Sequence, residues 1–450
     1  MEKGKFKNDI PITIDHSEIT VKNNSQTKED FKLAHQIKLK SWCSSVRSVN
    51  VTPDDQYLII TNCKNSRIRV FDLTKLEYLP HKYNGHTATV RLTSTSHDSC
   101  AFFTSSWDKS HRLFNIITGK CTLLLYSQNQ NRSPSCFYDS KNKLLFTGEY
   151  SDFEINPGNK GVCWDLSIRK PVNTYKHFNE RLNPECIDIA WDQEFVYTAS
   201  DDGCAFKWHL YGKNPIFKFF EFDGTVRKIA ISKNYFIAAC TDSIVRVHNK
   251  FSGGYVNYFI HDKEVKDVCI SKDETKIYSA ADDGTVHCHD LMSKKLIFKS
   301  KVGSTWIWSM CLYNKDKNIV IGSIDGRITF LSAETGQILA YLYNLPYEND
   351  VIMTSPSDKA FPNGFFYTTS KDIVEVFSVD EKSIIQGKLE LYNSRRIAYL
   401  NKLNLKNLML TRIKNKRQYE SLTNNFLKNQ KLIASINHFH DSPKALQTKI

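Results

Sequence analysis

The side chains best suited to chemistry, the histidines and cysteines, are scattered along the chain. The 14 histidines form no HExxH pair, and the densest group, His438–His440, has only Asp441 as a nearby carboxylate. The 12 cysteines occur singly, with no CxxC pair, and most fall in apolar segments where a thiol behaves as a small buried hydrophobe. We therefore expect reduced cysteines, no metal site and no catalytic nucleophile.

The motifs that mark the common enzyme classes are also missing from the sequence. It contains no P-loop, no GxSxG and no dinucleotide fingerprint. The Asp-Asp-Gly turns at 201–203 and 282–284 resemble calcium loops, but they lack the downstream glutamate of an EF-hand. The sequence therefore predicts a non-enzymatic protein without a cofactor.

Composition limits the class of protein. The chain has 450 residues, of which 41% are hydrophobic and 12% aromatic, enough for a substantial core. It has no run of 18 or more apolar residues, and residues 1–20 lack the apolar stretch of a secretory signal. We expect a cytoplasmic protein, with the nucleus as the alternative location.

The positive charge is concentrated in the C-terminal tail. The net charge is +13, but the segment from Ser394 to Ile450 has 12 Lys and Arg against two acids, so the other 393 residues carry only +3. Helical spacing begins after Leu391, and no Gly or Pro interrupts residues 388–442. We expect a basic helical tail over 392–450, and three interpretations stay open for it. The helices could pack back on the rest of the chain, bind a partner protein, or lie on RNA or anionic lipid.

One phrase recurs through the middle of the chain: a short apolar strand, a turn with Asp, and a strand ending in an aromatic or polar pair. The copies cover 61–73, 104–116, 161–166, 198–210, 241–250, 279–291, 322–336 and 369–379. Their last-strand positions, 40 to 50 residues apart, are Phe71, Phe114, Trp164, Trp208, His248, His289, Leu331 and Phe377. A period near 40–45 is typical of four-stranded propeller blades.

The segments inside each unit support an all-β closed fold. In the sixth unit, alternating segments at 265–271, 276–280, 286–290 and 295–299 are separated by polar turns. We predict an all-β propeller over residues 39–391, with eight four-stranded blades, or with seven and one degenerate unit used elsewhere. An extension, residues 1–38, precedes it, and the apolar pieces at 10–19 and 31–39 are candidates for a strand that closes the ring.

These repeats resemble the WD-repeat (WD40) family over roughly residues 40–390. The Trp-Asp pair closes the phrase only at Trp164–Asp165, and Gly-His is found only at Gly85–His86. The resemblance implies a structural tetrad of His, Ser or Thr, Asp and an aromatic residue in a blade. The matching residues are His86, Thr104 and Asp108 with Phe114; His177, Thr198, Asp202 and Trp208; and His261, Ser279 and Asp283 with His289. We interpret these histidines as structural.

The resemblance also implies a ring of residues around the mouth of the central channel, one from the first strand of each blade. The basic members are Arg47, Arg91, Arg227 and Lys266, and the others are Pro134, Ile187, Trp308 and Ile352, with Trp306 beside Trp308. Arg and Trp dominate binding hot spots, and convergent arginines suit carboxylate or phosphate. The ring could bind an acidic or phosphorylated segment of a partner, or each arginine could pair with an aspartate such as Asp188 or Asp267 and stiffen the ring.

The function implied by the resemblance is that of a scaffold or adaptor that binds protein partners through the faces of the propeller. The alternative is an RNA- or ribonucleoprotein-associated subunit, or a protein of anionic membranes, that uses the basic tail. Because folds do not fix functions, the two must be separated by the chemistry of particular surfaces.

Overall fold

A computed structural model describes residues 45–62, 66–127, 131–150, 160–177, 186–220, 222–344, 351–356, 366–368, 405–415 and 418–424. The extension 1–38 with its candidate closing strand, Cys43, Cys63, residues 151–159 of the third unit, Phe377 and the tail beyond 424 lie outside these ranges.

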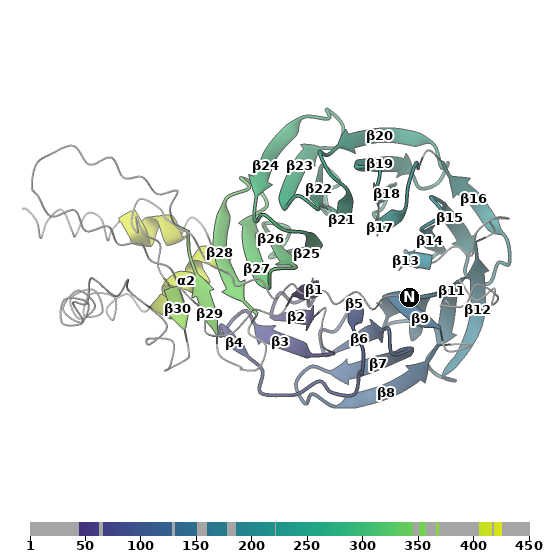
Figure 1. Ribbon diagram of the computed structural model, residues 1–450, viewed down its shortest axis with the longest axis horizontal. Helices are drawn as coiled ribbons and strands as arrows, with labels where there is room; N and C mark the ends of the chain where they lie inside the picture. Colours follow the sequence, from purple (N-terminus) through teal and green to yellow (C-terminus); the bar gives the residue numbers. More distant parts are fainter. Residues whose placement is uncertain are drawn as a thin grey trace, which may run out of the picture.

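The described strands form seven antiparallel sheets arranged as blades around a central channel (Figure 1). Each blade is built from four consecutive strands, the first innermost and the fourth at the rim. Blades 1 to 3 are β1 (Val46–Val51), β2 (Tyr57–Asn62), β3 (Ile68–Asp72), β4 (Glu77–Tyr78); β5 (Val90–Thr95), β6 (Ala101–Ser106), β7 (Ser110–Asn115), β8 (Cys121–Tyr126); and β9 (Arg132–Asp139), β10 (Leu144–Tyr150), β11 (Lys160–Asp165), β12 (Lys170–Lys176). Blades 4 and 5 are β13 (Cys186–Trp191), β14 (Phe195–Ser200), β15 (Ala205–His209), β16 (Pro215–Phe219); and β17 (Val226–Ile231), β18 (Tyr235–Cys240), β19 (Ile244–Asn249), β20 (Tyr255–Ile260). Blades 6 and 7 are β21 (Val265–Ile270), β22 (Lys276–Ala281), β23 (Thr285–Asp290), β24 (Leu296–Lys301); and β25 (Ile307–Tyr313), β26 (Asn318–Ser323), β27 (Arg327–Ser332), β28 (Ile338–Tyr343).

How deeply a strand is buried depends on its radial position. Both faces of each blade pack against the neighbouring blades, and this packing covers the second strands more completely than the strands at the rim. The second strands β2 and β26 are buried at every residue, whereas the rim strand β24 is mostly exposed. Between blades the apolar side chains form separate clusters, such as the one in which Phe219 stacks on Phe236 with ring centroids 3.8 Å apart. The core is therefore a ring of interfaces between blades.

The propeller has seven blades, which was the alternative to the predicted eight. The eighth unit does not form a blade in the described residues: β29 (Ile352–Thr354) pairs with β28, and β30 (Phe366–Thr368) pairs with β29. The seventh sheet therefore has six strands and projects outward from the ring (Figure 1). The assignment of Ile352 to the channel ring is wrong, because β29 is stacked outside β28, away from the inner strands.

The ring closes by packing blade 7 against blade 1. Gly322 of β26 makes this approach possible, since a Cβ at that position would lie 2.6 Å from Cγ1 of Val46. The backbone N–H of Val49 donates to Oγ of Ser309 across the same seam, at 3.2 Å. The outer edge of β28 is already paired with β29. The closing strand at 10–19 or 31–39 stays an untested prediction.

Part of the basic tail packs on this seam. Helix α2 (Leu405–Lys414) buries Met409 and Ile413 in the cluster formed by blades 7 and 1, and the helical segment 418–424 adds Tyr419. Arg412, also buried, donates from Nε to the carbonyl of Leu339 at 2.6 Å. For the described residues 405–415 and 418–424, the contacts agree with the packed-helix interpretation. No helix in the described ranges is long and apolar enough to cross a membrane.

Candidate functional site: the mouth of the central channel

The inner strands of the seven blades surround a cavity of about 680 Å³ along the axis of the ring. We call the end where these strands begin the top face and the opposite end the bottom face. Seven of the eight residues assigned to the ring line the cavity: Arg47, Arg91, Pro134, Ile187, Arg227, Lys266 and Trp308. The sequence pattern thus identified one position in each of seven blades that faces a common space.

A repeated bulge explains why this position faces the channel. In six blades the pairing of the first and second strands skips one residue of the first strand, as between Val46 and Ser48 in β1 and between Val226 and Lys228 in β17. The skipped residues are Arg47, Arg91, Ile187, Arg227, Lys266 and Trp308. A bulged residue leaves the alternation of the strand and re-aims its side chain.

Two indoles contact the guanidinium groups of two of the three ring arginines, Arg47 and Arg91. The guanidinium of Arg47 lies over the ring of Trp308 at 3.8 Å from the centroid. Trp306, 48% exposed, packs edge-on against Trp308 with ring centroids 5.8 Å apart. Cation–π contacts of this kind fix the direction of an arginine without neutralising its charge.

The second indole is Trp107, in the turn between β6 and β7. The guanidinium groups of Arg91 and Arg132 lie 5.0 and 5.4 Å from its centroid. Sequence reasoning did not identify Trp107 or Arg132 as mouth residues, because Trp107 lies outside the first strand and Arg132 begins a longer one. The sequence did offer one indication of Trp107: it belongs to a Trp-Asp pair that lies in a turn and not at the end of a third strand.

Lys266 is a structural member of the ring. Its ammonium pairs with the carboxylate of Glu264 at 2.6 Å and with that of Asp282 at 3.1 Å. Burial raises the pKa of Asp282, although Lys266 opposes that rise. With two carboxylates around it, Lys266 contributes little net positive charge to the mouth.

Below the mouth, three charged residues of blades 4 to 6 form a belt inside the channel. Asp188 accepts from Lys228 Nζ at 3.1 Å and from the backbone N–H of Ile229 at 3.0 Å. Asp267 accepts from the backbone N–H of Met310 at 2.7 Å. Burial raises the pKa of Asp267 to about 6, and the charge of Lys228 limits the rise. The two aspartates thus join blade 4 to blade 5 and blade 6 to blade 7.

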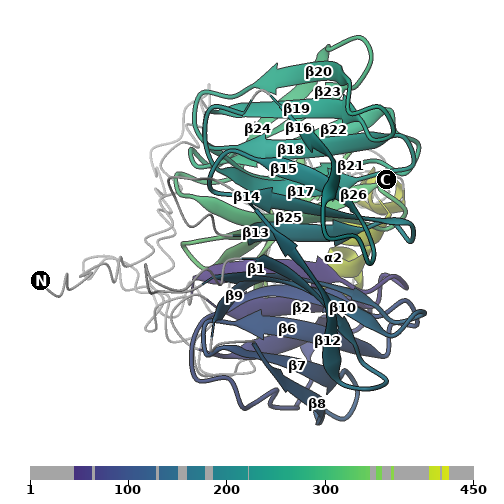
Figure 2. The same cartoon turned by 90° about the vertical axis from the view of Figure 1, so that its right-hand side faces the viewer.

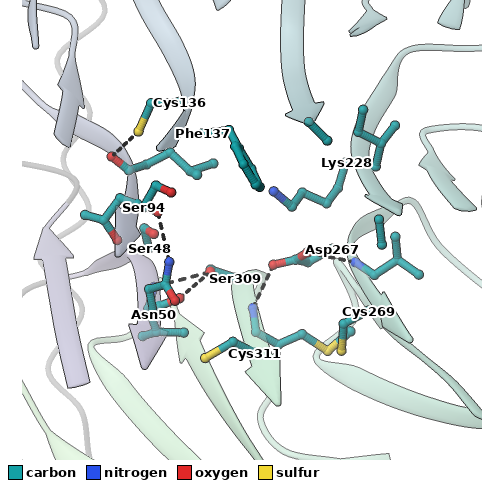
Figure 3. A pocket seen from close by; sticks show the side chains of 18 of the residues that line it. Ser48, Asn50, Ser94, Cys136, Phe137, Lys228, Asp267, Cys269, Ser309 and Cys311 are labelled. Atoms are coloured by element: carbon teal, nitrogen blue, oxygen red, sulfur yellow. Dashed lines mark hydrogen bonds between the residues drawn. The ribbon is translucent and has the colours of Figure 1, made fainter. Parts of the chain in front are cut away.

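Figure 3 shows this part of the cavity, with Lys228 and Asp267 pointing into the space that Phe137 also faces. Neutral groups join the other blades there: Asn50 Nδ2 donates to the carbonyl of Thr93 at 3.0 Å, and Ser94 Oγ accepts from the N–H of Tyr138 at 2.9 Å. Most of these polar side chains therefore form hydrogen bonds that join one blade to the next.

The cysteines of the channel are poor nucleophiles. Burial raises the pKa of the Cys136 and Cys311 thiols to about 12 and that of Cys269 well above its ordinary value. A thiol that stays protonated neither attacks a substrate nor binds a metal readily. In the described residues no group of three or more His, Cys, Asp and Glu side chains could hold a metal ion.

The expected tetrads lie away from the channel, inside the blades. In blade 2, Nδ1 and Nε2 of His86 are each 2.7 Å from their partners, a carboxylate oxygen of Asp108 and the hydroxyl of Thr104. Hydrogen bonding and the charge of His86, followed by Ser110, outweigh burial and hold the pKa of Asp108 below its ordinary value. The ring of Phe114 lies 6.4 Å from that of His86.

The tetrad of blade 4 is centred on the hydroxyl of Thr198. It accepts from Nε1 of the fully buried Trp208 at 2.8 Å and lies 2.7 Å from Nε2 of His177. The carboxylate of Asp202 is 4.0 Å from Nδ1 of the same histidine. Burial lowers the pKa of His177 to about 4, so the imidazole is neutral at pH 7.

The tetrad of blade 6 is partly assembled. Nε2 of His261 is 2.6 Å from the hydroxyl of Ser279. The carboxylate of Asp283 accepts from Thr285, and Nδ1 of His261 has no hydrogen-bond partner within the described ranges. His289, in the place of the usual tryptophan, stacks on Phe259. Burial lowers the pKa of His261 to about 3 and that of His289 to about 4.

Comparisons with known proteins agree with this architecture. Residues 255–290, from β20 to β23, match the family model for the WD domain, G-beta repeat. The chain is 21% identical over 225 residues to the human F-box and WD repeat domain containing protein 10B, and equally so to human F-box/WD repeat-containing protein 10. Each alignment covers 43% of this chain, but only 29% and 21% of those proteins. The seven blades of four strands and the matching repeat together support a β-propeller of the WD-repeat type.

Proposed function

We propose that the protein is a non-enzymatic scaffold that binds an acidic or phosphorylated segment of a partner at the top mouth of its channel. The observation that carries the proposal is the convergence of Arg47, Arg91 and Arg227 on one cavity, each from a bulge that aims it there. Arginine forms forked hydrogen bonds with carboxylate and phosphate, and several around one opening add their fields.

The indoles at the mouth support the same function. Trp306 is half exposed beside Trp308, and Trp107 lies beneath two guanidinium groups. Large aromatic residues next to arginines are the usual composition of binding hot spots. A bound segment could place its anionic groups on the arginines and an apolar side chain on Trp306.

The structural alternative is that the arginines only stiffen the ring. The aspartates first considered as partners of the arginines have other partners: Asp188 pairs with Lys228, and Asp267 accepts from backbone N–H groups. The charge of Arg227 acts on the carboxylate of Asp282, so this arginine has a carboxylate nearby as well. Lys266 fits the structural alternative, because Glu264 and Asp282 already surround it.

Partner capture with a charge-matched control tests the proposal. The variant replaces Arg47, Arg91 and Arg227 with Ala. The control replaces three exposed lysines of bottom-face turns, Lys141, Lys272 and Lys317, so that the net charge falls equally. We expect the arginine variant to lose its partners and keep its melting temperature, and the control to keep both. An arginine variant that retains every partner and melts early would establish the stiffening role instead.

A further inference from the structure

The bottom face carries a feature that repeats from blade to blade. In blades 2 to 6 the turn between the third and fourth strands presents a large apolar side chain, more than half exposed. We call these residues the apolar tips; they are Ile117, Ile168, Tyr211, Phe251 and Met292. Single exposed apolar residues are ordinary on protein surfaces. Their recurrence at the same turn of five successive blades places them around one rim.

The turns that carry the tips are held by the preceding blade. In four of the five, a side chain of that blade, or of the connection that follows it, donates to the carbonyl immediately before the tip. The pairs are Tyr83 Oη to Ile116, Tyr175 Oη to Leu210 at 2.6 Å, Lys207 Nζ to Lys250 at 2.9 Å, and Asn257 Nδ2 to Leu291 at 2.7 Å. The tips are therefore displayed on fixed backbone, which lowers the entropy lost when they meet a second surface.

The five turns that carry the tips contain positive charge only, whereas the turns between the first and second strands on the same face include Asp98, Asp192 and Asp273. The five turns, residues 116–120, 166–170, 210–214, 250–254 and 291–295, contain seven Lys and Arg and no Asp or Glu. One of the seven, Lys250, pairs with Asp192. Such turns should attract a negatively charged surface.

The top ends of the rim strands provide a contrast. Tyr126, Phe220 and Ile260 are exposed there to a similar degree as the tips. The connections that follow Phe220 and Ile260 are acidic, with Asp223 and Asp262 among their residues. At the rim, apolar side chains are exposed on both faces, but those on the bottom face lie in turns that are positively charged.

The remaining arc of the bottom face is covered by the tail. Lys406 of α2 pairs with Glu77 of blade 1, and the carbonyl of Lys414 accepts from Asn314 Nδ2 of blade 7 at 2.9 Å. Figure 2 shows the ring from its side, with α2 against one face. In these two blades the position of the tip is occupied by Thr74 and Glu334. The apolar and basic arc is therefore continuous over blades 2 to 6 and ends where α2 begins.

We propose that this arc docks on a membrane surface rich in anionic headgroups. Each blade carries one tip, so the tips are too far apart to form a single pocket for a peptide. The turns lie on the same face of the ring, so all of them can contact a flat surface. Side chains such as Tyr, Phe and Met inserted to headgroup depth, with Lys and Arg beside them, are what binds peripheral proteins to anionic bilayers. The mouth on the top face would stay accessible to a partner.

Vesicle flotation with the full chain tests the proposal, using phosphatidylcholine vesicles with and without phosphatidylserine. One variant replaces three tips with serine: Tyr211→Ser, Phe251→Ser and Met292→Ser. The matched control makes the same change on the top face: Tyr126→Ser, Phe220→Ser and Ile260→Ser. We expect binding of wild type to the anionic vesicles, weakened by salt, and a loss of about tenfold or more in partitioning for the tip variant alone. A charge variant, Lys213→Glu with Lys295→Glu, should lose binding as well without removing any apolar contact.

Three outcomes would overturn the proposal. Wild type could fail to float with anionic vesicles. The tip and charge variants could float as wild type does, which would assign any lipid binding to the basic tail that both variants retain. The top-face control could lose as much binding as the tip variant, which would show that exposed apolar area alone carries it.

Discussion

Replacing Ile413 with alanine should destabilise the whole protein, although Ile413 lies in the tail. Its side chain is 1% exposed and packs with residues of blades 7 and 1. Its carbonyl accepts from Tyr313 Oη at 3.3 Å and from Asn318 Nδ2 at 2.5 Å, so the helix cannot easily move to fill a void. The change removes three carbons at about 0.8 kcal/mol each and leaves a cavity, for a total of about 3 kcal/mol.

Urea denaturation of the full-length protein measures this loss, and hydrogen exchange locates it. Protection should fall first in β1 and in β25 to β28, where the seam lies, and later in blade 4. The control is Leu422→Ala, a substitution at a residue that is 38% exposed in the segment after α2, which should cost well under half as much. If Ile413→Ala unfolds at the same urea concentration as wild type, α2 does not belong to the core.

Further predictions concern the blades, the pH dependence and the channel. Trp208→Ala should cost about 3–5 kcal/mol in a denaturant titration, and an unchanged midpoint would contradict the burial of its indole. The protein should be less stable at pH 5 than at pH 7, because burial lowers the pKa of four histidines to about 3 or 4, whereas the unfolded chain takes up protons near 6.5. These four are His111, His177, His261 and His289. Their contribution is complete above about pH 6.5 and is lost as the pH falls, at roughly 2 kcal/mol each by pH 5, and the raised pKa of Asp267 opposes this by about 1 kcal/mol. Stability that is flat or rising between pH 7 and pH 5 would contradict this sign. Asp188→Ala should cost about 3 kcal/mol or more, because it strands Lys228 and a backbone N–H, whereas Lys228→Met should cost less.

The repeat made much of the fold readable from the sequence. The last-strand positions expected for seven units lie at equivalent places in their blades, as Phe71 does in β3 and Trp208 in β15. The repeat is easy to recognise because each blade packs apolar side chains against both neighbouring blades at the same strand positions. The mouth residues followed from the resemblance to WD-repeat proteins, and in six blades they are the residues that the bulge skips.

The features that the sequence did not predict, the pairing of β29 and the buried face of the tail helix, depend on long-range contacts. The eighth unit has the local pattern of a strand pair, but pattern alone does not say which sheet a pair joins, and β29 joined β28. In the tail, the helical spacing did not show which side chains are buried: Met409 and Ile413 form the buried face, whereas Leu422 is 38% exposed. Which face of a helix is buried depends on the surface that receives it, and that surface is assembled from both ends of the ring.

Binding of a defined anionic peptide tests the proposed function of the mouth most directly. A labelled polyglutamate peptide and a phosphoserine peptide would be titrated with purified full-length protein, and their fluorescence anisotropy recorded at low and high salt. We expect saturable binding of at least one of them, weakened by salt, and a loss of about tenfold or more in the variant lacking Arg47, Arg91 and Arg227. Binding of neither peptide, or equal binding by wild type and that variant, would contradict the proposed function.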